Sequence, residues 1–225
     1  MRPTAGCESN AASSFDQFII DQSPNDLNYG LLKTVQSSRF SSLMPWHLDQ
    51  VSNIISQETI NTPINTIIDA CANIGVDTIL FRLLFPYANI VAIELNTDTY
   101  NVLKENMDNI SQITGQYKKP ITVKNMDCLD YINNVDLLYF DPPWPDNYKQ
   151  GTINLSLSGY DLGDIVNNAI KNATLVIVKL PFNFNFNLFE QKVNRGIKTI
   201  INYYKIFTQG KNPKIAYELA FIRKL

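Results

Sequence analysis

Residues 65–85, NTIIDACANIGVDTILFRLLF, decide the fold that the 225-residue chain predicts. The first part, through Ala72, is a largely apolar run of the kind that forms a buried strand. From Gly75 onward the spacing of apolar residues favours a helix, which Pro86 closes. A strand, a turn with one glycine and a helix are the opening unit of a doubly wound α/β sheet.

The same alternation continues along the chain. Its strands are continuous apolar runs, which is typical of a parallel sheet covered on both faces. Further strands are predicted at 89–95, 121–127, 135–141 and 174–181, and helices at 96–110, 161–173 and 186–194. Two β-rich runs at 198–207 and 214–225, joined by TQGKNP, predict a closing hairpin. The sequence thus predicts a Rossmann-like, seven-stranded, mostly parallel sheet with one antiparallel strand and helices on both faces.

The domain organisation follows from the polar N-terminus. Residues 1–28 show no sustained period and are expected to form a flexible tail, so that 29–225 make a single domain. An amphipathic helix is expected from the segment SSLMPWHLDQVSNIISQ, with Pro45 in its first turn. No run approaches the roughly 18 to 20 apolar residues that cross a bilayer, and no apolar secretory signal is apparent.

Cysteine, histidine and charge narrow the compartment and the ligand class. The scattered Cys7, Cys71 and Cys128 offer no metal or disulfide pattern, which favours a reducing intracellular compartment, cytoplasmic or nuclear, and no zinc. The single histidine, His47, is expected on a helix surface rather than in a metal site. A net charge of −2 is unusual for a protein that grips long nucleic acid. Three options stay open: another substrate, a short piece of nucleic acid, or a partner that supplies cationic surface.

Acids stand at the ends of four successive predicted strands. Ligands of such sheets bind beyond the carboxyl ends of the strands, so these side chains are expected to meet at one site. The second of them has the spacing at which a carboxylate reaches ribose hydroxyls. The first turn has one glycine and so cannot cradle a pyrophosphate, but it suits a nucleoside without phosphates, such as S-adenosylmethionine (SAM). The four acids are Asp69, Glu94, Asp127 and Asp141.

The stretch DPPW, residues 141–144, follows the fourth strand. An aryl amine is a poor nucleophile, and the Asp141 carboxylate with the Pro142 carbonyl would favour a pyramidal nitrogen with its lone pair available. Pro142 and Pro143 fix the backbone so that the loop presents carbonyls at a set angle. Trp144 offers a base a stacking face. The alternative is a rigid turn in which Trp144 fills the core.

This combination resembles the SAM-dependent amino-methyltransferases, which carry an acid-Pro-Pro-aromatic motif. The SAM motif precedes DPPW here, which does not fit the permuted adenine-N6 enzymes of mRNA. Within the class the chain resembles the trimethylguanosine synthase family, which methylates the N2 amine of a 7-methylguanosine RNA cap. The resemblance covers residues 38–225 and rests on RFSSLMPWHLDQVSNII, DACANIGVDTILF, VAIEL, MDC and DPPWPDNY.

The resemblance implies SAM as cofactor and RNA, most specifically its cap, as partner; it implies no metal. It gives Glu94 to the ribose and Asp127 to the adenine amine. Asp141, Pro142, Pro143 and Trp144 fall on the catalytic loop. The family's SAM-loop positions are occupied by Asp69, Asn73, Gly75 and Thr78, and the segment that closes over the cofactor by Phe40 and Pro45.

The chain also departs from the family. Asn73 and Val76 replace glycines of the first loop, Asp141 replaces a serine, and Pro145-Asp146 replaces Gly-Gly. Phe182 stands where an arginine is frequent. These departures keep open an adenine-N6 or rRNA guanine-N2 methyltransferase, and a catalytically silent binding subunit. Basic residues that could contact cap phosphates remain, but each is expected rather to be a solvated surface charge; they include Arg39, Lys149, Lys179 and Lys211.

Overall fold

The structure is a computed structural model that describes residues 32–33, 45–113 and 119–225. The predictions that concern the tail 1–28, Phe40 and Arg39 lie outside these residues. The division of the chain into a tail and one domain stays a prediction.

The elements follow the predicted order, and their bounds differ from the predicted ones by a few residues. The helices are α2 (Pro45–Thr59), α3 (Val76–Leu84), α4 (Thr97–Ile113), α5 (Leu162–Ala169) and α6 (Phe186–Val193), with a 3₁₀ turn η3 (Cys128–Asp130). The strands are β1 (Thr66–Asp69), β2 (Asn89–Glu94), β3 (Ile121–Asn125), β4 (Val135–Phe140), β5 (Ser156–Leu157), β6 (Tyr160–Asp161), β7 (Ala173–Leu180), β8 (Thr199–Phe207) and β9 (Ile215–Lys224). The short β5–β6 hairpin was not predicted, because two-residue strands leave no periodic signal.

The main sheet has seven strands in the order β3-β2-β1-β4-β7-β9-β8. The first five of these are parallel to one another, whereas β9 runs antiparallel to both β7 and β8. The chain order reverses between β1 and β4, which is the switch point where doubly wound sheets bind ligands. The predicted fold class is confirmed, including the single antiparallel strand.

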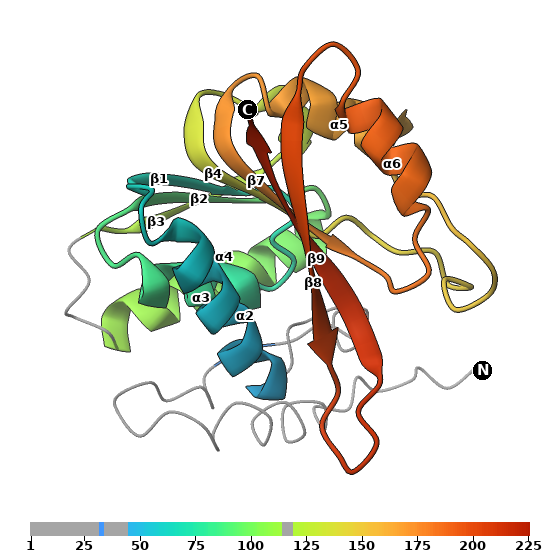
Figure 1. Cartoon of the computed structure of the whole chain (residues 1–225). Coiled ribbons are helices and arrows are strands. Elements are labelled where there is room, and N and C mark those ends of the chain that lie inside the picture. Colours follow the sequence, from blue (N-terminus) through green and yellow to red (C-terminus); the bar gives the residue numbers. More distant parts are fainter. Residues whose placement is uncertain (1–31, 34–44, 114–118) are drawn as a thin grey trace, which may run out of the picture.

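Helices cover both faces of the sheet (Figure 1). Helices α2, α3 and α4 lie on one face, where Ile55, Phe81 and Leu103 are among the buried side chains. Helices α5 and α6 lie on the other, with Val166 and Phe189 in a second apolar cluster. The central strands are buried on both sides, which explains their continuous apolar sequence.

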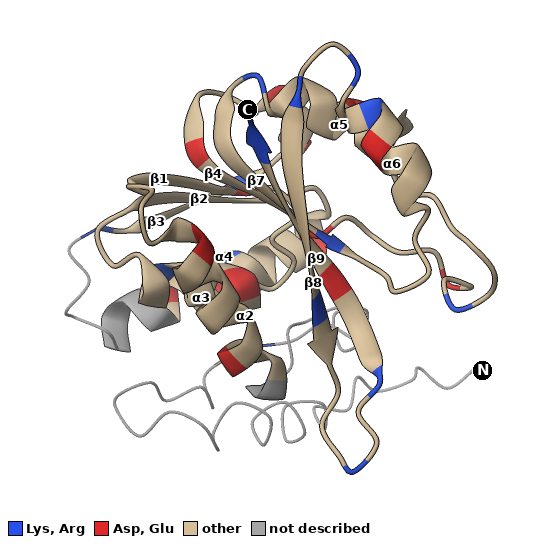
Figure 2. Cartoon of the chain, in the orientation of Figure 1, with Lys and Arg blue, Asp and Glu red and all other residues tan. Residues whose placement is uncertain are grey.

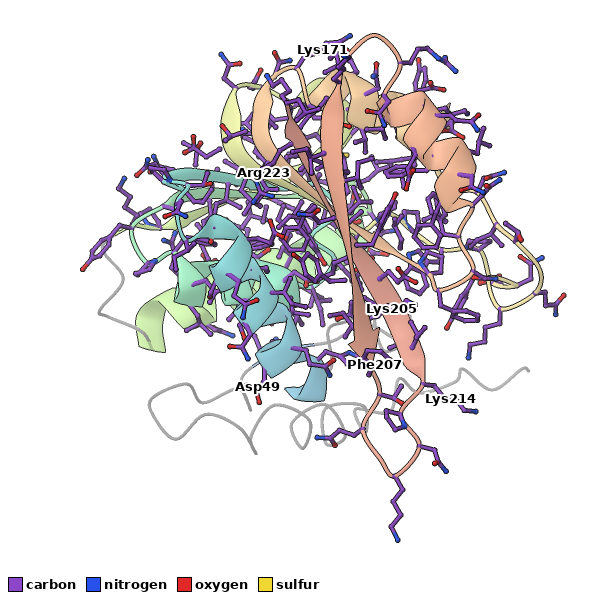
Figure 3. All side chains as sticks on the ribbon, in the orientation of Figure 1. Asp49, Lys171, Lys205, Phe207, Lys214 and Arg223 are labelled. Carbon is purple, nitrogen blue, oxygen red and sulfur yellow. The ribbon has the colours of Figure 1, made fainter. Side chains whose placement is uncertain are left out.

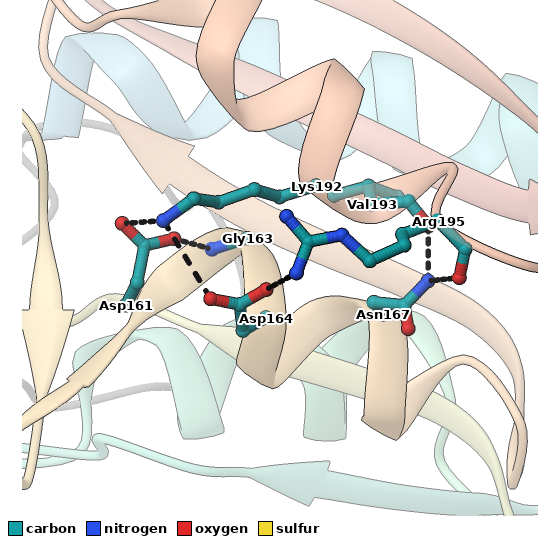
Figure 4. Close-up of polar contacts among 7 residues, drawn as sticks. All are labelled: Asp161, Gly163, Asp164, Asn167, Lys192, Val193 and Arg195. Carbon is teal, nitrogen blue, oxygen red and sulfur yellow. Dashed lines mark hydrogen bonds and ion pairs between the residues drawn. The ribbon is translucent and has the colours of Figure 1, made fainter.

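Polar side chains fix the starts of the helices. Asn96 accepts a hydrogen bond from the backbone N–H of Thr99 (2.9 Å) and so caps α4. Asp161 does the same for Gly163 (2.9 Å) at the start of α5. Figure 4 shows that Asp161 also pairs with Lys192 of α6, at 2.8 Å, so that the cap residue joins the two helices.

Among the helices that the structure describes, none has both the length and the apolar composition that a membrane span requires.

Candidate active site

The four predicted acids lie at neighbouring places on the carboxyl edge of the sheet. Asp69 ends β1 and is paired in register with Tyr139 of β4, two residues before Asp141. Glu94 ends β2 opposite Asn125 of β3, and Asp127 follows two residues later. The sequence therefore placed these residues at one edge correctly. Their roles toward a ligand stay predictions.

Asp69 is fully buried, with one carboxylate oxygen paired and one unpaired. The Thr78 hydroxyl donates to Oδ2 at 2.5 Å, across the turn between β1 and α3. The other oxygen, Oδ1, is buried and has no hydrogen-bond partner in the part of the chain that the structure describes. Burial, and then the neighbouring Asp77, raise the pKa of Asp69 well above its usual value. An unpaired buried acceptor is costly, and Asp69 Oδ1 is such an acceptor.

The turn between β1 and α3 depends on backbone conformations that few residues adopt. Gly75, with φ 95°, starts α3 in the left-handed region. Asn73 is also left-handed, with φ 51°, and asparagine is among the residues that tolerate this region. The carboxylate of Glu94 accepts from the backbone N–H of Asn73 (3.0 Å) and of Asn96 (2.8 Å). Glu94 therefore stabilises the turn between β1 and α3, although position 73 of this turn is asparagine and not glycine.

Asp127 connects the 3₁₀ turn η3 to the loop that follows the DPPW stretch. Its Oδ1 accepts from the backbone N–H of Leu129 (2.9 Å), and its Oδ2 accepts from the Ser158 hydroxyl. Ser158 is left-handed, with φ 51°, in the turn between β5 and β6. Asp127 therefore fixes the far end of the loop beyond DPPW.

Asp141, the first residue of DPPW, forms a buried ion pair with Lys179 of β7. The Lys179 Nζ lies 2.7 Å from Asp141 Oδ2, and the two side chains are 5% and 12% exposed. The prediction that Lys179 is a solvated surface charge was wrong. Strand β7 lies beside β4, so a lysine near its end faces the residue that follows β4. The sequence around Lys179 does not show that β4 is the strand beside β7.

Further titratable groups surround this pair. The Tyr139 hydroxyl lies 3.2 Å from Asp77 Oδ1, and the Lys179 ammonium lies 5.0 Å from the centre of the Tyr217 ring. Burial raises the pKa of Asp141 to about 6, although Lys179 opposes the shift. Burial lowers the pKa of Lys179, but the carboxylates of Asp141 and Asp77 outweigh it, and the net shift is upward. The two upward shifts have different causes: burial raises the pKa of Asp141, and the neighbouring carboxylates raise that of Lys179.

His47 belongs to the same region, and its predicted position on a helix surface was wrong. It is 6% exposed, and its ring meets Tyr217 of β9 edge to face at 5.1 Å. Burial, and then Lys179, lower its pKa to about 4, so the ring is neutral at physiological pH. The local sequence of α2 does not show that this side of the helix packs against Tyr217, near the start of β9.

Trp144 lies between the two apolar clusters of the molecule. It is partly buried, packs against side chains of both, and meets Tyr148 edge to face at 5.1 Å. Its indole N–H is buried without a hydrogen-bond partner in the described part of the chain. Asn183, in the LPFN stretch, donates through Nδ2 to the carbonyl oxygens of Tyr148 (2.6 Å) and Gly151. Asn183 therefore fastens the loop that carries Trp144.

The remaining basic residues with predicted surface positions are exposed where the structure describes them. Lys149 follows Tyr148 in the loop, and Lys211 lies between β8 and β9. Within residues 32–33, 45–113 and 119–225, no group of three or more His, Cys, Asp or Glu side chains could hold a metal ion.

The sheet order and the switch point define a class: the chain has the Rossmann-like fold of the SAM-dependent methyltransferases. Solved structures of similar fold cover most of the chain. A Pyrococcus horikoshii protein, PH1948, provisionally assigned as an RNA methyltransferase, is 16% identical and has a TM-score of 0.57; the match covers 86% of this chain and 93% of that one.

Two further structures have comparable similarity. The human methyltransferase 10 domain containing protein is 16% identical, with a TM-score of 0.56 and coverage of 88% of this chain and 90% of that one. A SAM-dependent methyltransferase from Agrobacterium tumefaciens is 13% identical, with a TM-score of 0.54 and coverage of 81% and 63%. No protein-family model matches the chain, and no curated protein matches it in sequence. At these identities the similarity concerns the fold.

Proposed function

We propose that the protein is a SAM-dependent RNA methyltransferase that acts on the exocyclic N2 amine of a 7-methylguanosine cap. The observation that carries the proposal is the DPPW loop at the switch point of the sheet, with Asp141 buried at its start and Trp144 half-buried against both apolar clusters. Neighbours named as SAM-dependent or RNA methyltransferases support the reaction class.

The residues on the first two strands fit SAM. The unpaired Asp69 Oδ1 and the surrounding carboxylates form an acidic site, which suits a ligand that carries an ammonium and a sulfonium. Glu94, already beside the backbone of Asn73, would bind the ribose, and Asp127 would lie near the adenine. When bound, SAM supplies a methyl group on a sulfonium and leaves as a neutral thioether.

The catalytic loop would act on the amine that receives the methyl group. That amine would form one N–C bond as the S–C bond of SAM breaks, and its proton would pass to the Asp141 carboxylate. Lys179 occupies Asp141 Oδ2 and compensates its charge, so that the carboxylate can accept from the amine through its other oxygen. Together with the Pro142 carbonyl, this arrangement would favour a pyramidal nitrogen, and the buried surroundings would exclude water from it.

Trp144 is proposed to stack on the guanine. A 7-methylguanine is cationic, and an indole face attracts cations. Adenine-N6 methylation is the second candidate, because Asp141 is an acid where the cap family has a serine. A silent subunit is the third, but the left-handed Asn73 keeps the first turn in shape without a glycine, which argues against a collapsed cofactor loop.

The test uses labelled SAM with three acceptors in parallel: a 7-methylguanosine cap analogue, uncapped RNA and an adenine-bearing oligonucleotide. We expect transfer to the cap analogue alone. Transfer to adenine would replace the proposal by the second candidate, and absence of SAM binding in calorimetry would leave the silent subunit.

The Trp144→Ala variant separates a stacking platform from a core residue. Loss of a stacked base costs about 1–3 kcal/mol, so we expect cap-analogue affinity to fall by about 5- to 150-fold while SAM affinity stays near that of the wild type. Tyr87→Ala, at a 62%-exposed tyrosine before β2, is the matched control and should change neither affinity. An equal loss of SAM and cap binding in Trp144→Ala would show that the indole is structural.

A further inference from the structure

The β8–β9 hairpin extends beyond the edge of the sheet that carries the candidate active site. Leu219 of β9 is paired with both Lys179 of β7 and Tyr204 of β8, so these three residues lie level across the sheet. Strand β8 continues past this level to Phe207, and at about 3.3 Å per residue this adds about 10 Å. Residues 205–214 therefore project past the level of the buried Lys179–Asp141 pair. Figure 1 shows the β8–β9 hairpin extending away from the rest of the sheet.

The projecting part is basic, although the whole chain is not. Residues 199–217 contain no acid, whereas the chain has a net charge of −2. Lys205, Lys211 and Lys214 are exposed (Figures 2 and 3), and only Lys205 has a carboxylate directly across the strands, Glu218. Lys211 and Lys214 lie near the tip of the hairpin, and neither forms an ion pair with an acid of the part of the chain that the structure describes.

Hydrogen bonds hold the hairpin in one conformation. Gln50 of α2 donates through Nε2 to the Phe207 carbonyl (2.9 Å) and accepts from the Phe207 N–H (3.0 Å). Beyond it, the Thr208 N–H donates to the Lys214 carbonyl (2.9 Å), and the Lys214 N–H donates to the Thr208 hydroxyl (3.0 Å). A pre-ordered surface loses less conformational entropy when it binds a ligand.

Phe207 adds an aromatic face to this surface. Its side chain is 39% exposed at the end of β8, between Lys205 and the lysines of the tip. Lysines around an exposed ring are the combination with which proteins hold single-stranded nucleic acid: the cations contact phosphates and the ring stacks on a base.

We infer that the hairpin surface formed by Lys205, Phe207, Lys211 and Lys214 binds the single-stranded RNA that continues from the target nucleotide. The inference rests on the proposed function, because it assumes that the base enters the site beside Asp141. It explains how an acidic protein can engage RNA: the cationic contacts are confined to one projecting element. A cap dinucleotide is too short to need this surface, whereas a longer transcript would reach it.

The test compares a charge-neutralised hairpin with a matched control. The test variant carries Lys205→Gln, Lys211→Gln and Lys214→Gln. The control carries Lys119→Gln, Lys171→Gln and Lys198→Gln. These three exposed lysines precede β3, β7 and β8, which run in the same direction, and so lie at the opposite edge of the sheet. Figure 3 shows Lys171 at the end of the molecule opposite the hairpin. Both variants change the net charge equally.

Two measurements are made on each protein: binding of a fluorescent capped RNA of about 20 nucleotides at several salt concentrations, and methyl transfer to the cap dinucleotide. We expect the hairpin variant to bind the long RNA at least about tenfold more weakly, with a salt slope reduced by about 2, since each lost phosphate contact on a single strand removes about 0.7. Transfer to the dinucleotide should equal that of the wild type, and the control should match the wild type in both measurements.

Three outcomes would overturn the inference: unchanged RNA binding, an equal loss in the control variant, or an equal loss of transfer to the dinucleotide. Failure of the proposed function has a different signature. In that case the wild type transfers no methyl group to any cap, while the binding titration still reports whether the hairpin contacts RNA.

Discussion

Two lysine–aspartate pairs in this molecule have the same chemistry and nearly the same length, but they lie in different surroundings. Lys179 and Asp141 are 2.7 Å apart, at 5% and 12% exposure, beneath the candidate catalytic loop. Lys192 and Asp161 are 2.8 Å apart, at 19% and 28% exposure, between α5 and α6 (Figure 4). The second pair has further partners at the surface, Asp164 and Arg195, whereas the first lies against Tyr217.

The difference shows what each pair is for. A pair near water exchanges hydration for a salt bridge at little net gain. A buried pair loses far more hydration, and replacing both partners by apolar groups is frequently neutral or stabilising. Its retention at the switch point therefore calls for a reason other than stability. In the proposed function, that reason is to hold an ionised acceptor beside the substrate amine.

The largest effect is expected from Lys179→Met. It leaves Asp141 buried without its cation, which costs about 3–5 kcal/mol of unfolding free energy in comparable cases. Urea denaturation monitored by circular dichroism measures it. The double variant Lys179→Met, Asp141→Asn should recover a large part of the loss, because residue 141 then carries no charge.

The matched control is Lys192→Met, which should leave the urea midpoint close to that of the wild type. Equal destabilisation by Lys179→Met and Lys192→Met would contradict the distinction between the two pairs. A double variant no more stable than Lys179→Met alone would show that packing, and not charge, explains the loss. Methyl transfer by a folded double variant should be strongly reduced under the proposed function.

Gly75, which precedes α3, and Gly163, in the first turn of α5, give a smaller, independent comparison. Gly75, with φ 95°, has a left-handed backbone, and a Cβ there would approach Met107 Cε to 2.5 Å and Leu103 Cδ1 to 2.7 Å. Gly75→Ala should therefore cost about 1–3 kcal/mol and weaken SAM binding through the displaced first turn. Gly163 has no such backbone requirement, but its Cβ would meet Lys192 Cβ at 2.8 Å.

Gly163→Ala should lower stability by less than Gly75→Ala and leave SAM affinity unchanged. Urea denaturation and calorimetry measure the two quantities on both variants. If Gly75→Ala bound SAM as tightly as the wild type, the first turn would not be the cofactor loop that the sequence predicts.

The fold and half of the site could be predicted from the sequence, because both are encoded locally. Each of the apolar runs of β1, β4 and β7, and an acid directly after a strand such as Asp141, can be recognised from a few consecutive residues. Lys179 and His47 could not be placed in this way. Lys179 is 38 residues from Asp141 in sequence, and His47 packs against Tyr217 near the other end of the chain. A single lysine at a strand end, or a single histidine in a helix, indicates a surface residue unless the strand order is already known.

The smallest expected effect is the pH dependence of SAM binding. It tests whether a buried carboxylate responds to a ligand differently from a solvated one. The pKa of Asp141 is raised from 3.8 to about 6, mainly by burial, and those of Asp69 and Asp77 are raised too. A raised carboxyl pKa favours the folded free protein at low pH, and this contribution is lost as the pH rises through about 6. The cationic SAM favours the ionised carboxylates, so its binding should release protons.

The affinity for SAM should therefore rise as the pH increases through about 6 and level off above it, by at most about tenfold per pH unit for each proton released. S-adenosylhomocysteine, which lacks the sulfonium charge, should show a shallower dependence in the same calorimetric titration. His47, with a pKa of about 4, stays neutral across this range and adds little to the slope, while the ammonium of Lys179 stays charged. Identical slopes for the two ligands would mean that the carboxylates at this edge do not sense the sulfonium. In that case the Lys179–Asp141 pair would be a structural ion pair that differs from the Lys192–Asp161 pair only in its burial.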